Sequence, residues 1–171
     1  MPRTTAPPPK RAAGIKRENL RNQLWPDSPT LFWDRNKVDG FTTVPRTLGL
    51  IITLIEMLAE RQKGHDVARV YFELWCRIFD EGTTEIQDEE AVAFASGFVT
   101  SRKQRSWKER VKTLVDLGFI RVAPLGARTS GLILVLDPHQ VVKKLRSENL
   151  VPDSWWGAYT KRATEIKYPL P

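Results

Sequence analysis

Residues 101–117 constrain the fold most, because they place apolar and charged side chains on opposite sides of one predicted helix. At about 100° per residue, four apolar residues share one side of this helix: Trp107, Val111, Leu114 and Val115. The opposite side carries four charged residues, with Ser106 and Thr113 at its margin: Arg102, Arg105, Glu109 and Lys112. Gly118 supplies a C-terminal stop. We therefore expect the Trp107 side to be buried and the Arg105 side to face solvent.

A β-hairpin is predicted directly after this helix. Phe119–Ala123 and Leu132–Leu136 have the composition of short strands. Residues 124–131 lie between them and are too many for a two-residue turn, so the pattern predicts a hairpin with an extended loop.

Shorter elements are predicted before the helix. Asp66 is expected to cap a helix that ends before Gly82, and residues 83–87 favour a short strand. Asp88 is expected to cap a brief helix over residues 89–96. Cys76 falls inside the first of these helices, where we expect a small buried residue.

The ends of the chain add an arm and further helices to this middle part. We expect residues 1–41 to form a basic, proline-containing arm that is largely disordered. Within this arm, residues 14–24 are expected to form a helix only on contact with a partner. We expect residues 42–136 to form the main domain and residues 137–171 to form a helical extension. The fold class is therefore mainly α with a small β-hairpin, an α+β arrangement.

The helix predicted over residues 45–61 has a second apolar stripe, formed by Leu50, Leu54 and Met57. A helix that is apolar on two sides is either buried within its own fold or shared with another subunit. The stripe therefore predicts one of two arrangements. It forms a homodimer, alone or with the C-terminal helices, or the helices of residues 137–166 cover it within one chain.

The positive charge is concentrated in two short segments. The formal net charge is +7, from 27 basic and 20 acidic residues. Residues 1–24 and 101–112 each contain six basic residues and one acidic residue, so the rest of the chain is slightly acidic. Concentrated basic segments favour a polyanion as partner, although charged runs are also found on solvated faces that bind nothing.

Several classes of protein are not indicated. Hydrophobic residues make up 41% of the chain, as in a globular protein, and no apolar run is long enough to cross a membrane. The first 24 residues lack the apolar core of a secretion signal, which favours a cytoplasmic location. One cysteine and two distant histidines do not indicate a metal site or a disulfide framework. No phosphate-binding loop, dinucleotide fingerprint or nucleophile elbow is found, so we expect neither an enzyme nor a cofactor.

The order of predicted elements over about residues 66–136 resembles that of the winged helix-turn-helix superfamily. The resemblance rests on this order, on the basic face, and on the phrase Leu114-Val115-Asp116-Leu117-Gly118-Phe119-Ile120. It implies a supporting helix at 89–96, a recognition helix at 101–117 and a wing at 125–131, with extra helices at both ends of the chain.

The resemblance also implies which residues would contact double-stranded DNA. The outward residues of the recognition helix would enter the major groove: Arg102, Arg105, Ser106 and Glu109. Three lysines would contact phosphates: Lys103, Lys108 and Lys112. Arg128 at the wing tip would approach the minor groove or the backbone. The basic arm would follow a groove or add attraction through Arg11, Lys16 and Arg17, besides Arg3 and Lys10.

Some of these residues have structural alternatives. Trp107 could stack on a base, but its phase with Val111 and Leu114 favours the core. Glu109 could pair with Arg105, four residues earlier, instead of contacting a base. Arg110 could brace the acidic segment 85–90.

The predicted function is sequence-specific binding of double-stranded DNA, as a transcriptional regulator of a bacterium, phage or plasmid that is associated with the nucleoid. One alternative is a plasmid replication initiator or maintenance protein, since winged helices serve there too. A second alternative is an interaction module that binds protein or RNA.

Overall fold

The computed structural model describes residues 12–27, 31–37, 39–61 and 65–169. The chain divides into two compact units, Met1–Phe41 and Thr42–Pro171, and each is described by itself. In the first unit, α1 spans Ala12–Leu24 and has no buried residue. The sequence predicted a helix here only on contact with a partner, whereas the structure has it in the isolated chain.

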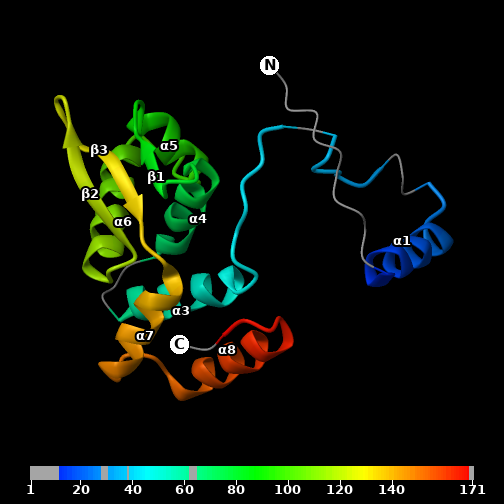
Figure 1. Cartoon of the computed structure of the whole chain (residues 1–171). Helices are drawn as coiled ribbons and strands as arrows, with labels where there is room; N and C mark the ends of the chain where they lie inside the picture. Colours follow the sequence, from blue (N-terminus) through cyan, green and yellow to red (C-terminus); the bar gives the residue numbers. More distant parts are fainter. Residues whose placement is uncertain (1–11, 28–30, 38, 62–64, 170–171) are drawn as a thin grey trace. The chain divides into compact units, whose positions relative to one another are not determined.

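The second unit contains helices and a small antiparallel sheet (Figure 1). The elements follow one another as α3 (Leu48–Glu60), α4 (Val67–Arg77), β1 (Thr83–Glu85), α5 (Glu89–Ala95), α6 (Lys103–Asp116), β2 (Ile120–Leu125), β3 (Arg128–Val135), α7 (Pro138–Ser147) and α8 (Asp153–Glu165). The predicted class, mainly α with a small β-hairpin, is confirmed.

The sheet has the strand order β1-β3-β2, with β3 in the centre and both neighbours antiparallel to it. Ile133 of β3 lies opposite Thr84 of β1 and Val122 of β2. The short strand before α5 and the hairpin after α6 thus belong to one sheet, although α5 and α6 separate them in the sequence.

The predicted extended loop of the hairpin is wrong. Leu125 pairs with Arg128, so only two residues connect the strands, and Gly126 has the positive φ (61°) that such turns favour. The register shifts between Ala123 and Leu125, which places Pro124 at a bulge where its missing N–H is tolerated. Residue 131 of β3 has to be glycine, because a Cβ at this position would stand 2.6 Å from the Cβ of Leu125.

Of the two predicted helix caps, the one at Asp88 is confirmed and the one at Asp66 is wrong. Asp88 accepts hydrogen bonds from the backbone N–H groups of the first turn of α5, at 2.9 and 3.0 Å. Asp66 makes no cap bond, because its φ of 58° is left-handed and not the extended conformation of an N-cap. Instead, Glu56 of α3 accepts a bond from the N–H of Ala68 at 2.7 Å, so a neighbouring helix satisfies the start of α4.

The core lies between the sheet and the surrounding helices. Its largest fully buried side chains include Trp107, Tyr71, Tyr159 and Phe119. Cys76 is exposed, contrary to the sequence prediction, because it lies on the Phe72 side of α4 and not on the buried side.

The second apolar stripe of α3 is covered in part by the C-terminal helix of the same chain. Leu54 is fully buried, and Leu50 and Met57 pack against the core. The indole N–H of Trp155, on α8, donates to the carbonyl of Leu50 at 2.8 Å. Of the two arrangements predicted for this stripe, these contacts favour burial within one chain.

Candidate nucleic-acid interface

Helix α6 has one side in the core. Trp107 and Leu114 are fully buried and Val111 nearly so, as their spacing predicted. The ring of Trp107 is therefore part of the core and is not available to stack on a base. Because this side is packed, the direction of the opposite side is fixed relative to the sheet.

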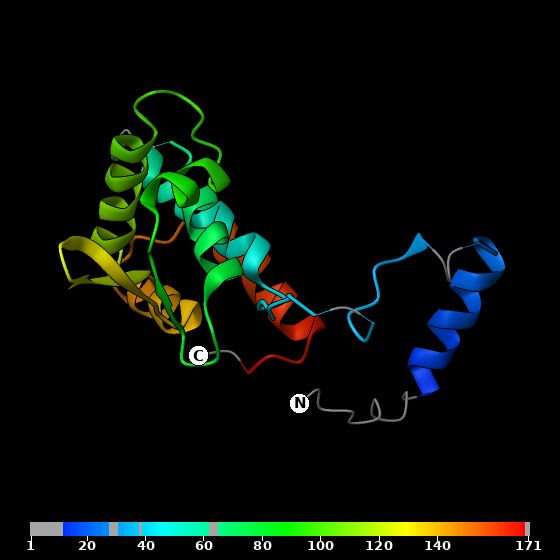
Figure 2. The same cartoon turned by 90° about the horizontal axis from the view of Figure 1, so that it is seen from above.

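The opposite side of α6 faces solvent. Arg102 is exposed, the side chain of Arg105 is 80% exposed and that of Lys112 is 77% exposed. Ser106 is half-buried at the margin. Residues 97–102 join α5 to α6 in a loop that is exposed except at Phe98 and lies at the end where α6 begins (Figure 2). The start of α6, with Arg102 at the N-cap and Arg105 in the first turn, is thus accessible.

A shallow hollow on this exposed side brings together residues that the sequence analysis only partly identified. It is lined by Gln104, Arg105, Lys108, Glu109 and Lys112. Gln104 was not predicted as a contact, although an amide side chain beside the two arginines has the groups to bond an adenine edge.

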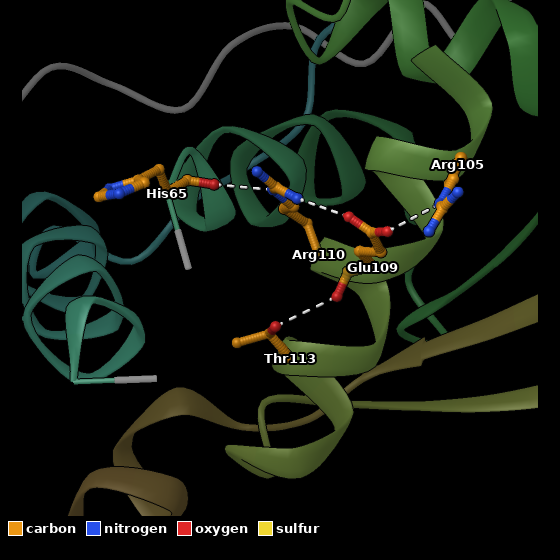
Figure 3. Close-up of polar contacts among 5 residues, drawn as sticks. All are labelled: His65, Arg105, Glu109, Arg110 and Thr113. Atoms are coloured by element: carbon orange, nitrogen blue, oxygen red, sulfur yellow. Dashed lines mark hydrogen bonds and ion pairs between the residues drawn. The ribbon is translucent and has the colours of Figure 1, made fainter. Parts of the chain in front are cut away.

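A hydrogen-bond network fixes Glu109 in place (Figure 3). One carboxylate oxygen of Glu109 accepts from Nε of Arg105 at 3.1 Å, and the other accepts from Nη1 of Arg110 at 3.1 Å. Arg110 also donates from Nε to the carbonyl of His65 at 2.9 Å, which links α6 to the segment before α4. Both oxygens of Glu109 are therefore engaged, as the pairing alternative predicted for Arg105.

This network orients Arg105. Because Glu109 binds Nε, it leaves the two terminal nitrogens at the exposed end of the side chain, with no hydrogen bond or ion pair to another described residue. The two terminal nitrogens of an arginine are the pair that can bond both N7 and O6 of a guanine.

Two lysines of α6, Lys103 and Lys108, bind the start of α5. Nζ of Lys103 lies 2.5 Å from a carboxylate oxygen of Glu90, and Nζ of Lys108 lies 2.8 Å from one of Glu89. The sequence predicted both lysines as phosphate contacts and Arg110 as the residue that braces the acidic segment. The structure gives the bracing role to the two lysines, because α5 packs against α6 on their side.

Lys112 is also paired, with Asp116 at 2.8 Å. The Lys112 and Arg105 pairs both join residues four apart on an exposed helix surface. Such pairs contribute only about 0.3–0.5 kcal/mol, so a phosphate can replace Asp116 on Lys112 at little cost.

The hairpin presents a different cation from the predicted one. The guanidinium of Arg128 is half-buried and donates to the carbonyl of Ile86, so its side chain is anchored at the junction of β1 and α5. The tip itself is Gly126 and Ala127. Arg121 is exposed on β2, and as the one charged residue of this strand it could have been identified from the sequence.

The basic residues of the arm belong to the first unit. Lys16 and Arg17 are exposed on α1, whereas Arg3, Lys10 and Arg11 lie outside the described residues.

Other features also bear on the chemistry of the described residues. Those residues contain no group of three or more side chains placed to hold a metal ion. None of their helices combines the length and apolar character needed to cross a bilayer. Partial burial, together with the carboxylate of Glu73, raises the pKa of the Cys76 thiol, which disfavours the reactive thiolate.

Comparison of the chain with protein-family models, with curated proteins and with solved structures found no match.

Proposed function

We propose that this protein binds double-stranded DNA in a sequence-specific manner, with α6 in the major groove. The observation that carries the proposal is the exposure of Arg105 on α6 and of Arg102 at its N-cap, while the Trp107 side of the helix is buried, beside the β2–β3 hairpin. A rigid helix that presents arginines near its N-terminal end has the geometry of a major-groove recognition helix. The strand order β1-β3-β2 of the sheet supports the winged-helix resemblance on which the proposal rests.

In this proposal, Arg105 recognises a guanine and Glu109 orients it. The carboxylate holds Nε, and the terminal nitrogens bond N7 and O6 of the base. In this proposal Glu109 supports Arg105, to which its carboxylate is already bonded, and does not take the role first expected for it, acceptance from a cytosine. Arg102 and Gln104, near the start of α6, are the other side chains that would contact bases.

The phosphate contacts are assigned to Lys112 and Arg121. Lys103 and Lys108 are paired with Glu90 and Glu89, so they offer little free positive charge to a DNA backbone at the start of α5. We therefore infer that the backbone lies along the Lys112 side of α6 and the outer surface of β2, and not against the start of α5.

The proposal is tested by selection of duplexes from a random pool, followed by titration of the selected duplex against salt. We expect a defined sequence that contains guanine, and an affinity whose logarithm falls by about 0.9 per phosphate contact and per logarithm of salt. A pool that shows no enrichment at low salt, combined with a stable complex with protein or RNA, supports the interaction-module alternative instead.

The biological role is proposed as transcriptional regulation in a bacterium, phage or plasmid, with the protein in the cytoplasm on the nucleoid. The symmetry of the selected site separates this role from that of a replication initiator. A palindrome indicates a two-fold dimer at a promoter, whereas direct repeats indicate an initiator or maintenance protein.

A further inference from the structure

The first unit exposes four large aromatic side chains within a short part of the chain. The exposed fractions are 60% for Trp25, 40% for Phe32, 63% for Trp33 and 46% for Phe41. Single exposed apolar residues are common on protein surfaces, but a concentration of aromatic rings points to a binding surface.

Cationic side chains lie beside these rings. The guanidinium carbon of Arg21 is 4.2 Å from the centre of the Phe32 ring, and that of Arg35 is 5.9 Å from the centre of Phe41. The rings of Trp33 and Phe41 meet edge to face, with their centres 6.0 Å apart. Aromatic and cationic groups therefore lie beside one another in this unit, and its described residues also include four carboxylates, of which Glu18 and Asp34 pair with Arg21 and Lys37.

The arrangement on α1 does not fit a membrane surface or a helix-binding groove, because both require one continuous apolar face. At about 100° per residue, Ile15 and Leu20 are about 140° apart around the helix. Arg17 is only about 20° from Leu24 by the same measure. Apolar and basic side chains are thus mixed around α1 and do not form two faces.

A surface of interleaved rings and cations complements a single-stranded nucleic acid. Unpaired bases offer flat faces on which aromatic side chains stack, and the phosphates between them are held by cations. A duplex offers no such faces, because its bases are already stacked on one another.

We propose that the described residues between 12 and 41 bind single-stranded nucleic acid, with bases stacked on Trp25 and Trp33 and the phosphates held by Arg35 and by Lys16 and Arg17 of α1. This inference goes beyond the proposed function and does not depend on the duplex contacts of α6.

The test measures binding of the full chain to a fluorescent oligothymidine by anisotropy at low salt. We expect Trp25→Ala and Trp33→Ala each to weaken this binding about 5- to 150-fold, the equivalent of ~1–3 kcal/mol per stacked base. Trp25→Phe and Trp33→Phe are expected to retain most of the affinity, because a ring remains. Phe94→Ala, which removes a 62% exposed ring from α5, is the matched control and should leave binding unchanged.

A variant in which Arg102 and Arg105 are both alanine separates this proposal from that for α6. It should lose the selected duplex and keep the oligothymidine. The proposal is overturned if the wild-type chain does not bind oligothymidine, if the two alanine variants bind it as well as the wild type, or if vesicles of anionic lipid are bound in its place in a tryptophan-dependent manner.

Discussion

Replacement of Trp107 by alanine tests whether the inner side of α6 is fixed in the core. Trp107 is fully buried and contacts the same core as Val111 and Leu114. Truncation of a buried tryptophan to alanine costs about 3–5 kcal/mol, since packing is lost and a cavity remains. For a chain of this size, that loss corresponds to a decrease of about 6–20 °C in the midpoint of thermal unfolding.

Trp107→Phe refines the prediction. The indole N–H of Trp107 is buried and has no hydrogen-bond partner among the described residues. Phenylalanine keeps an aromatic ring and removes this unpaired donor, whose burial costs about 1–3 kcal/mol. We therefore expect a much smaller loss of stability than for alanine.

Both variants are measured by urea unfolding followed by circular dichroism, with Arg105→Ala as the control. Arg105 is on the exposed side of the same helix, so its removal should change the free energy of unfolding by no more than about 0.5 kcal/mol. A Trp107→Ala protein that is as stable as the wild type but fails to bind nucleic acid would refute the reasoning. It would indicate instead that the ring contacts a base.

Three further predictions concern stability. Asp88→Ala should lower the free energy of unfolding by about 1 kcal/mol in urea titrations, while Asp88→Asn, which can still cap α5, should not. Gly131→Ala should destabilise the hairpin by about 1–3 kcal/mol, because its Cβ has no room, whereas Gly49→Ala in α3 meets nothing within 4 Å and should stabilise by up to about 1 kcal/mol. Burial lowers the pKa of His139 below its usual 6.5, so the folded state disfavours the charged ring. The free energy of unfolding should therefore have its full value above pH 6.5 and decrease as the pH falls below it. His139→Gln should remove this part of the pH dependence.

Features that depend on neighbours in the sequence were predictable. The burial of Trp107 follows from the helical period, and the cap at Asp88 follows from its position just before an acidic first turn. The order of elements from α4 to β3 could be predicted for the same reason, since each element has its own local pattern and stop signal.

Features that depend on tertiary contacts were missed. Lys103 and Lys108 look like free cations in the sequence, and only the packing of α5 against α6 brings them to carboxylates 13 and 19 residues away. The hairpin was misjudged because Pro124 and Gly131 favour loops. In the folded protein, one is accommodated at a bulge and the other is required by the close approach of the opposite strand.

The most direct test of the central claim compares the base preferences of the wild type and of Arg105→Ala in duplexes selected from the same random pool. The account predicts that the variant accepts any base at one position where the wild type requires guanine, with a loss of about 1–3 kcal/mol on the original site. Lys144→Ala, which removes a cation that is 73% exposed on α7, should retain the full preference. An identical preference in Arg105→Ala and the wild type would contradict the assignment of α6 as the helix that recognises DNA.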